Sequence, residues 1–365
     1  MCGIVGYLRF QHDWQDGQYQ DLIMHMSGCL AHRGPDSDGH WIDSKLGLAF
    51  GHRRLSIIDL SPAGHQPMIS SDGQGVLILN GEIYNFAELR SELELIGATA
   101  QWRGHSDTEV LLTALRHFGI EKTLQKINGM YAFAYADLQE KKLYLARDRF
   151  GEKPLYIYRD ADGMAFSSEL KAFKKLPHFD STIDSGSVAE FMAYAYVPQP
   201  RSIYQRAKKL PPGCYAILDL LHPADGMKTV TYWSARDTAI NCRKERITDE
   251  SQALSQLDDI LRRAVKSRMA ADVPLGAFLS GGIDSSTVVA LMQAQSSRPI
   301  KTYAIGFAED AFNEAPHAKA VAEHLGTQHT EQIVTAAEAM AVIPYLPEFY
   351  DEPFADSSQI PTYLV

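Results

Sequence analysis

The chain has 365 residues, and its 35 lysines and arginines against 45 aspartates and glutamates give a formal net charge of −10. A hydrophobic fraction of 45% and a charged fraction of 22% are those of a globular protein, which excludes a disordered or collagen-like chain. The negative charge argues against broad binding of nucleic acid or anionic membranes, and the length suits two domains of about 150 residues or more.

Cysteine usage and hydropathy predict a cytoplasmic protein without a membrane partner. No pair of cysteines or histidines has the spacing of a zinc finger, and no apolar stretch approaches the roughly 18 residues of a membrane span. The N-terminus lacks a charged segment followed by an apolar run. The cysteines are too few and too scattered for a disulfide framework: Cys2, Cys29, Cys214 and Cys242.

Short apolar strands alternate with turn signals over the first 200 residues. Asp72-Gly73 and Asp162-Gly163 have the composition of hairpin turns. The strands are predicted within segments 46–60, 75–85, 131–150 and 156–168. Helices are predicted at 21–30, 87–96 and 107–118, the last one capped by Ser106 or Asp107. This order favours an antiparallel α+β domain.

The pattern changes after a segment rich in proline and glycine at 197–235. A helix with an apolar stripe then leads into a buried strand at 273–280, a second helix at 285–295 and another buried strand at 301–307. Buried strands that alternate with helices are typical of a parallel α/β sheet covered on both faces. The stripe of the first helix consists of Leu254, Leu257, Ile260, Leu261, Ala264 and Val265. We therefore predict a domain over 2–200, a connection over 201–247 and a second domain over 248–365.

Cys2 is a candidate nucleophile because removal of Met1 would give it a free α-amine beside its thiol. An α-amine has a pKa near 8, so it can take the proton of an adjacent nucleophile. A thiol that attacks an amide also needs an oxyanion hole, which Asn80-Gly81 could supply. By position alone, Cys2 also fits a small apolar residue that opens a buried strand, and Asn80-Gly81 also fits a turn.

Two further features could hold a substrate that carries a carboxylate and an ammonium group. The pair Arg53-Arg54 has the fork geometry that binds carboxylates, and we place it just before a strand at 55–59. Asp107 could hold an ammonium group. The arginines also fit a solvated pair, and Asp107 also fits a helix cap.

Six segments carry a resemblance to a known family: MCGIVGY (1–7), AHRGPDSDG (31–39), GHRRLSIIDLSPAGHQPM (51–68), NGEIYN (80–85), SDTEV (106–110) and RDRFGEKPLY (147–156). They resemble the class II glutamine amidotransferase domain. Their combination and order resemble the glutamine-hydrolysing asparagine synthetase family over essentially the whole chain.

This resemblance implies a fold and a set of site residues. The N-terminal domain would be an antiparallel-sheet sandwich of the N-terminal nucleophile hydrolase type, with Cys2 as the nucleophile. Arg54 and Asp107 would hold the α-carboxylate and α-amine of glutamine. Asn80 and Gly81 would form the oxyanion hole, and the backbone at Ile57, Ile58 and Glu82 would line the pocket.

The segment SGGIDSS (280–286) lies between a predicted strand and a predicted helix, and lacks the lysine of a Walker A motif. Small residues at a helix N-terminus form a phosphate-binding nest, or simply a capped helix after a glycine turn. The segment resembles the pyrophosphate loop of ATP pyrophosphatases. The resemblance implies ATP as a substrate with Mg²⁺ near Asp284, no permanently bound cofactor, and adenine flanked by Leu279 and Ile305. The implied phosphate ligands are Ser280, Gly281, Gly282, Asp284, Ser285 and Ser286.

The segment DEPFADSSQIP (351–361) matches the stretch that lies by the acceptor site in the family, and it also fits a loop with helix caps. Family members continue well beyond this length, so we expect a partial α/β domain, in a fragment or in a chain completed by a partner. Four histidines share no short spacing, which favours ordinary core or loop roles over a metal site. They are His32, His52, His65 and His105.

The predicted function is a glutamine-dependent asparagine synthetase, an ATP-dependent carbon–nitrogen ligase. Its partners would be glutamine, ATP and an acceptor carboxylate, with aspartate favoured, and a homodimer is compatible with the sequence. The alternatives are a paralogue that amidates another carboxylate, such as a sugar acid in polysaccharide biosynthesis, and a protein that only hydrolyses glutamine. SGGIDSS argues against enzymes that transfer ammonia to sugar phosphates, because those enzymes have no ATP loop.

Overall fold

The computed structural model describes residues 1–11, 13–98, 101–308 and 313–364. These residues form two compact units. The first contains Met1–Lys244 together with Asp351–Phe354, and the second contains Glu245–Tyr350 and resumes at Ala355. Val365, the end of the predicted second domain, lies outside the described residues.

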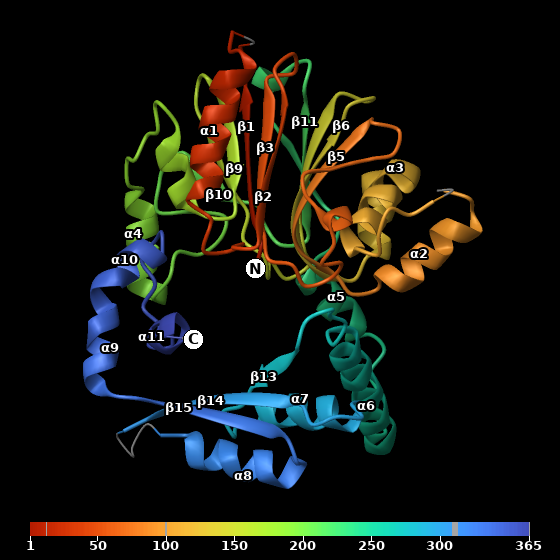
Figure 1. The fold of residues 1–365 in the computed structure, drawn as a ribbon, viewed down its shortest axis with the longest axis vertical. Coiled ribbons are helices and arrows are strands. Elements are labelled where there is room, and N and C mark those ends of the chain that lie inside the picture. Colours follow the sequence, from red (N-terminus) through yellow and green to blue (C-terminus); the bar gives the residue numbers. More distant parts are fainter. Residues whose placement is uncertain (12, 99–100, 309–312, 365) are drawn as a thin grey trace. The chain divides into compact units, whose positions relative to one another are not determined.

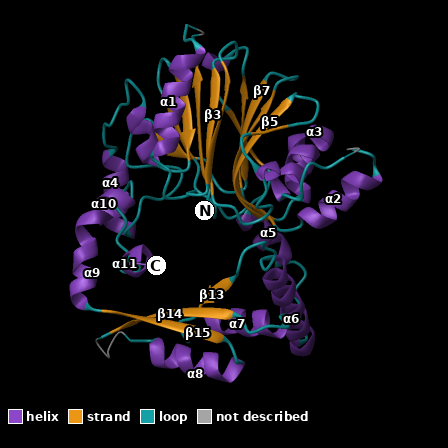
Figure 2. Cartoon of the chain, viewed as in Figure 1, coloured by secondary structure: helices purple, strands orange, loops and turns teal. Residues whose placement is uncertain are grey.

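Two antiparallel six-stranded sheets form the first unit (Figures 1 and 2). The strand order of one sheet is β10-β8-β9-β1-β3-β2, and that of the other is β12-β11-β7-β6-β5-β4. The first sheet consists of β1 (Gly3–Arg9), β2 (Ser37–Asp43), β3 (Leu48–Arg54), β8 (Tyr156–Arg159), β9 (Gly163–Ser167) and β10 (Ala207–Lys209). The second consists of β4 (Met68–Ile69), β5 (Gly75–Ile83), β6 (Gly129–Asp137), β7 (Lys142–Arg147), β11 (Cys214–Asp219) and β12 (Lys228–Thr231).

The central strands of this unit are buried on both faces. In β5, Val76 and Ile78 belong to a core that also contains residues of the first sheet, whereas Leu77 and Leu79 pack with residues of the flanking helices. Alternation of side chains along a strand explains why consecutive residues enter different cores. The two sheets therefore pack face to face, with helices outside them.

Helices cover the outer faces of the two sheets. Figure 1 shows α1 against the first sheet and α3 against the second. The spacing of Tyr19, Leu22, Ile23 and Met26 places all four on one face of α1, and all four are buried. The helices of this unit are α1 (Asp16–Gly28), α2 (Phe86–Leu95), α3 (Asp107–Lys126), α4 (Ser185–Tyr194) and α5 (Ala235–Cys242), with 3-10 helices at Pro62–Gly64, Leu170–Lys175 and Pro223–Asp225.

The second unit contains a parallel three-stranded sheet in the order β13-β14-β15. The strands are β13 (Gly276–Phe278), β14 (Lys301–Phe307) and β15 (Gln328–Val334). The helices are α6 (Glu250–Ser267), α7 (Ile283–Ala294), α8 (Ala315–Leu325), α9 (Ala336–Val342), α10 (Leu346–Phe349) and α11 (Gln359–Leu364), with a 3-10 helix at Ile343–Tyr345. Within the described ranges, no helix has the length and apolar character needed to span a membrane.

The structure corrects three local predictions. The strand predicted at 55–59 is wrong, because β3 ends at Arg54 and residues 55–60 form a loop. The strands of the second unit are not continuously buried: Phe278 is 66% exposed, and exposed and buried residues alternate along the first part of β14. Residues 201–247 are more than a connection, since they supply β10, β11 and β12 to the two sheets.

Candidate functional site

Cys2 lies beside the end of β3 because β1 pairs with that strand. The register of β1 and β3 places Gly3 opposite Arg53, so the next residue outward from each strand comes close to the other. The backbone N–H of Leu55 donates a hydrogen bond to the Cys2 Sγ over 3.4 Å. The thiol in turn lies 3.6 Å from the Leu55 carbonyl oxygen. The loop that replaces the predicted strand at 55–59 therefore contacts the candidate nucleophile.

A buried histidine of β3, His52, connects the first sheet to β5 of the second sheet. Burial lowers the pKa of His52 to about 3, so its imidazole is neutral at neutral pH. Its Nε2 lies 3.1 Å from the carbonyl oxygen of Leu79, and a neutral ring protonated at Nε2 donates this hydrogen bond. The bond fixes the main chain immediately before Asn80.

Asn80 is the most unusual polar residue at the site. Its side chain is fully buried, and within the described part of the chain neither its amide nitrogen nor its amide oxygen has a hydrogen-bond partner. An unpaired buried polar group costs about 1–3 kcal/mol, so such groups need an explanation. A preformed donor that waits for a developing oxyanion provides one.

Gly81 follows Asn80 in a conformation that other residues rarely adopt. Its φ is +153°, and a Cβ atom would lie 2.0 Å from the carbonyl oxygen of Met130. A side chain here would push β5 and β6 apart. The Asn80-Gly81 pair therefore lies near the end of strand β5, and the alternative interpretation of this pair as a turn is wrong.

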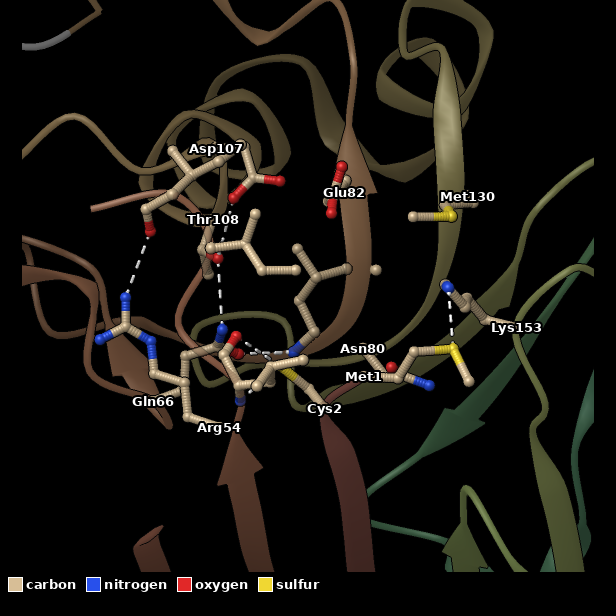
Figure 3. Close-up of a pocket in the computed structure, with 15 residues that line it drawn as sticks. Met1, Cys2, Arg54, Gln66, Asn80, Glu82, Asp107, Thr108, Met130 and Lys153 are labelled. Carbon is tan, nitrogen blue, oxygen red and sulfur yellow. Dashed lines mark hydrogen bonds between the residues drawn. The ribbon is translucent and has the colours of Figure 1, made fainter. Parts of the chain in front are cut away.

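A cavity of about 110 Å³ brings together all the residues predicted for the glutaminase site (Figure 3). Cys2 and Asn80 lie at one end, and Asp107 lies at the other in this view. The cavity is lined by Met1, Cys2, Arg54, Leu55, Ile57, Ile58, Gln66, Leu79, Asn80, Gly81, Glu82, Asp107, Thr108, Met130 and Lys153.

Arg54 supplies a buried positive charge to this cavity. Its side chain donates hydrogen bonds to the carbonyl oxygens of Ile58 and Ser61 over 3.3 and 3.4 Å, and to that of Asp59. Carbonyl oxygens orient a guanidinium without neutralising it. Within the described ranges no acidic side chain forms an ion pair with Arg54, so the charge fits the carboxylate of a ligand. Its neighbour Arg53 donates instead to the Ser27 carbonyl oxygen and lies 3.6 Å from the Asp38 carboxylate.

Asp107 is the first residue of α3, and Ser106 caps that helix by accepting from the Glu109 N–H. Burial raises the pKa of Asp107 to about 6, although the Ile83 N–H donates to its Oδ2 over 2.9 Å. Burial destabilises the charged form of this carboxyl, and an ammonium partner would stabilise it. Its position in the cavity fits that role.

Burial also affects the nucleophile and the N-terminal amine. Burial raises the pKa of the Cys2 thiol, so the thiol is protonated at neutral pH and needs a base. Burial lowers the pKa of the α-amine at Met1, and the charges of Arg33 and Lys153 contribute to this. The amine at Met1 is therefore neutral more readily than an exposed amine.

Several residues that line the cavity were not predicted from the sequence as site residues. Gln66 accepts from the Leu79 N–H over 2.7 Å and donates to the Thr108 hydroxyl over 3.3 Å, so it links β5 to α3. Lys153 is buried, and its Nζ lies 3.2 Å from the Met1 Sδ. Gln66, Thr108 and Lys153 all lie inside the six family-like segments, but nothing in their spacing shows which of them face the cavity.

The segment SGGIDSS forms a tight loop between β13 and α7. Gly281 has a φ of +79°, and a Cβ there would lie 2.7 Å from the His317 Cβ. The Ser285 hydroxyl lies 2.9 Å from that of Ser280 and accepts from the Ser280 N–H. The Ser286 hydroxyl is buried and, in the described ranges, has no hydrogen-bond partner. A loop of this shape at the N-terminus of a 12-residue helix fits an anion.

The other predicted ATP contacts lie around this loop. Leu279 is buried and donates its N–H to the Tyr303 carbonyl oxygen over 2.8 Å, and Ile305 lies in the neighbouring strand β14. Asp284 is in the first turn of α7. The described residues contain no group of three potential metal ligands, so Asp284 would need oxygen atoms of the substrate or of water to complete a Mg²⁺ site.

The segment 351–361 is divided between the two units: Asp351–Phe354 belongs to the first, and the second resumes at Ala355. Glu352 forms an ion pair with Lys209, and Asp351 accepts from the Lys171 N–H over 3.0 Å. The four histidines considered above lie apart: His32 contacts Glu169, His52 contacts Leu79, His65 lies against Gly39, and His105 contacts Asp59.

Comparison with known proteins gives a consistent result for both parts of the chain. The glutamine amidotransferase domain family matches residues 1–233, and the asparagine synthase family matches residues 256–365. The chain is 37% identical to asparagine synthetase [glutamine-hydrolyzing] 1 of Bacillus subtilis (strain 168), over its full length and 55% of that relative. It is 35% identical to putative asparagine synthetase [glutamine-hydrolyzing] 2 of Methanocaldococcus jannaschii, over its full length and 71% of that relative.

The chain thus spans between about half and three quarters of the length of these two relatives. Among solved structures, the glutamine phosphoribosylpyrophosphate amidotransferase from B. subtilis is similar with a TM-score of 0.46 and 18% identity. That match covers 90% of this chain and 65% of the other.

Proposed function

We propose a function on the premise that this chain belongs to the glutamine-hydrolysing asparagine synthetase family: its first unit releases ammonia from glutamine, and its second unit activates a carboxylate with ATP. The observation that carries the first part is the buried, unpaired amide of Asn80 in one cavity with the Cys2 thiol. Arg54 and Asp107 line the same cavity with opposite charges, as an amino acid ligand requires.

The proposed glutaminase reaction begins after Met1 has been removed. The α-amine of Cys2 takes the proton of the thiol, and the sulfur attacks the side-chain amide carbon of glutamine. The Asn80 amide nitrogen donates a hydrogen bond to the oxyanion that forms. The C–N bond then breaks, the amine returns its proton to the leaving nitrogen, and ammonia departs. Water hydrolyses the thioester, which releases glutamate and the free thiol.

Glutamine capture should depend on pH through Asp107. The carboxyl has a raised pKa of about 6, so it loses its charge as the pH falls through this value and can no longer hold an ammonium group. We expect kcat/KM for glutamine to fall about tenfold per pH unit below pH 6. At saturating glutamine the bound ammonium favours the carboxylate, so the acid limb of kcat should shift to lower pH.

Steady-state measurements of glutamate release between pH 4.5 and 8 test this expectation. Asp107→Asn should raise KM about 10- to 100-fold at pH 7.5 and remove the limb of kcat/KM near pH 6. A limb that persists unchanged in Asp107→Asn would assign the titration to another group.

For the second unit we propose ATP as the substrate held by the loop at 280–286. The Ser286 hydroxyl, which has no hydrogen-bond partner among the described residues, and the positive-φ turn at Gly281 fit a phosphate group. Mg²⁺ bound with ATP would neutralise phosphate charge, and Asp284 is the residue that would contribute to holding it. The carboxylate of the acceptor displaces pyrophosphate to give an acyl-adenylate, and ammonia then displaces AMP to give an amide.

ATP binding should be sensitive to any side chain at position 281. Gly281→Ala places a Cβ against His317 and Ala318, in a conformation that costs about 1 kcal/mol for alanine. We expect ATP affinity to fall at least about tenfold in titration calorimetry while glutamine hydrolysis is unchanged. Gly326→Ala is the matched control, because Gly326 has a φ of +69° but nothing within 4 Å of its would-be Cβ. Equal losses in both variants would show that only backbone strain matters.

We propose aspartate as the acceptor, in line with the names of the two relatives. The test is a panel of carboxylates, with glutamine-dependent pyrophosphate release and the amide product as readouts. Aspartate should respond and yield asparagine. A response to a sugar acid alone would instead support an amidating paralogue, and glutamate release without any ATP-dependent amide would support a glutaminase-only protein.

A further inference from the structure

A network of partly buried charges connects to the main chain of Cys2 through Arg33, which does not line the substrate cavity. Its centre is Glu169, whose Oε1 accepts from Arg33 Nη1 over 2.8 Å and contacts His32 Nε2 at 3.1 Å. Its Oε2 lies 2.9 Å from Lys171 Nζ. Burial opposes ionisation of Glu169, but the hydrogen bonds from these three residues outweigh it and lower its pKa to about 2. The carboxylate is therefore ionised whenever the protein is folded at neutral pH.

Arg33 connects this carboxylate to the nucleophile. While Nη1 binds Glu169, the Nε of the same guanidinium donates to the carbonyl oxygen of Cys2 over 3.0 Å. The Arg33 side chain is only 9% exposed. A planar guanidinium held at two edges fixes the direction of the group that it binds. Both the thiol and the α-amine of Cys2 project from the main chain that Arg33 holds.

Lys171 extends the network to a distant segment of the chain. Its backbone N–H donates to Asp351 Oδ2 over 3.0 Å, and its Nζ lies 3.7 Å from Asp351 Oδ1. The neighbouring Glu352 accepts from the Ile203 N–H over 3.2 Å and from the Tyr156 hydroxyl over 3.4 Å. Partly buried acidic groups with several donors each are firmly held.

The segment that contacts Lys171 belongs to a different unit from its neighbours in the sequence. Asp351–Phe354 belongs to the first unit, whereas the residues on both sides of it, Tyr350 and Ala355, belong to the second. Four consecutive contacts within the first unit lead from this segment to Cys2: Asp351 to Lys171, Lys171 to Glu169, Glu169 to Arg33, and Arg33 to the Cys2 carbonyl.

We propose that Glu169 is a positioning residue for Cys2, and that the seating of Asp351 on Lys171 makes the rate of glutamine hydrolysis depend on the segment Asp351–Phe354. This proposal rests on the glutaminase function proposed above. Reaction rates are sensitive to displacements of a nucleophile by about 1 Å, so a loosened Arg33 should slow attack without weakening glutamine capture by Arg54 and Asp107. A purely structural role would instead lower stability and leave the chemistry of the folded protein unchanged.

The experiment compares Glu169→Gln and Asp351→Asn with the unchanged chain. Glu140→Gln is the matched control, because Glu140 pairs with Lys142 at an exposed turn between β6 and β7. Four quantities are measured: kcat and KM for glutamate release, the rate of alkylation of Cys2 by iodoacetamide from the mass of the N-terminal peptide, and the midpoint of thermal unfolding. Alkylation reports on Cys2 even if the chain does not hydrolyse glutamine, so failure of the proposed function and failure of this proposal can be told apart.

We expect Glu169→Gln to lower kcat about 10- to 100-fold with KM changed less than about twofold, and to slow alkylation at least about fivefold. Asp351→Asn keeps an oxygen that accepts from the Lys171 N–H and loses only the charge, so it should fold and lower kcat about three- to tenfold. Glu140→Gln should match the unchanged chain. Normal kcat and alkylation in folded Glu169→Gln would overturn the positioning role, and normal kcat in Asp351→Asn would overturn the dependence on the segment.

Discussion

Replacing Cys2 by serine will lower glutamine hydrolysis by at least about 1,000-fold, which corresponds to about 4 kcal/mol in the barrier. Among the described residues that line the cavity Cys2 alone carries a thiol, and the Thr108 hydroxyl, which accepts a hydrogen bond from Gln66, is a much weaker nucleophile. A serine hydroxyl also keeps its proton far more strongly than a thiol, so the amine at this site would not activate it. Glutamate release, followed with a coupled assay, measures the effect.

The same assay tests the base. A version with an uncleaved N-terminal extension keeps the thiol but turns the α-amine into an amide, and it should be as inactive as Cys2→Ser. Cys242→Ser is the matched control, since Cys242 is exposed and lies in the last helix before the second unit. Full activity in the extended version, with its mass confirmed, would show that another group takes the thiol proton.

Replacing Asn80 by alanine will lower kcat for glutamine about 100- to 1,000-fold, while KM changes little. The reason is that Asn80 donates to the oxyanion and not to the substrate's charged groups, which Arg54 and Asp107 hold. Its effect on stability should be small. The cavity left by the side chain costs free energy, but removal of a buried amide without partners returns some, so we expect the free energy of unfolding to change by less than about 1 kcal/mol.

Asn85 provides the contrast within the same segment. Its amide nitrogen donates to the Lys126 carbonyl oxygen over 3.0 Å, and its amide oxygen accepts from the Asn128 N–H over 2.7 Å. Asn85→Ala should therefore lower stability by about 1 kcal/mol or more and leave kcat unchanged. If Asn80→Ala hydrolyses glutamine at the normal rate, the unpaired amide does not serve the oxyanion.

Local patterns in the sequence located three helices of the first unit but not all of their bounds, since α1 begins at Asp16 and α3 extends to Lys126, and they did not indicate α4 and α5. The period of Tyr19, Leu22, Ile23 and Met26 places one face of α1 on the first sheet, and Ser106 caps α3 where the spacing indicated. These features depend on residues three or four positions apart, so short-range chemistry determines them. The predicted α+β and α/β fold classes follow from the same kind of pattern and agree with the sheets of the two units.

Strand burial was harder to predict because it depends on what covers each face. Val76, Leu77 and Ile78 form a continuous apolar run, yet they lie in an antiparallel sheet, because a second sheet covers one face and α3 covers the other. The apolar residues Ile57 and Ile58 look like part of a strand. They lie in a loop instead, where the Ile58 carbonyl oxygen helps to hold the Arg54 guanidinium.

The sequence by itself determined which side chains were available for chemistry: a thiol at position 2, an Asn-Gly pair, an arginine and an aspartate in recognisable segments. Only the tertiary structure decided how they act, because it determines which of these side chains are buried and which of their polar atoms have hydrogen-bond partners. It leaves the Asn80 amide without a partner among the described residues, and burial raises the pKa of Asp107 to about 6. It also joins Arg33 to Glu169 and Lys171 to Asp351, across 136 and 180 positions of the chain. No local pattern encodes such contacts, since they exist only once both sheets and their connections have packed.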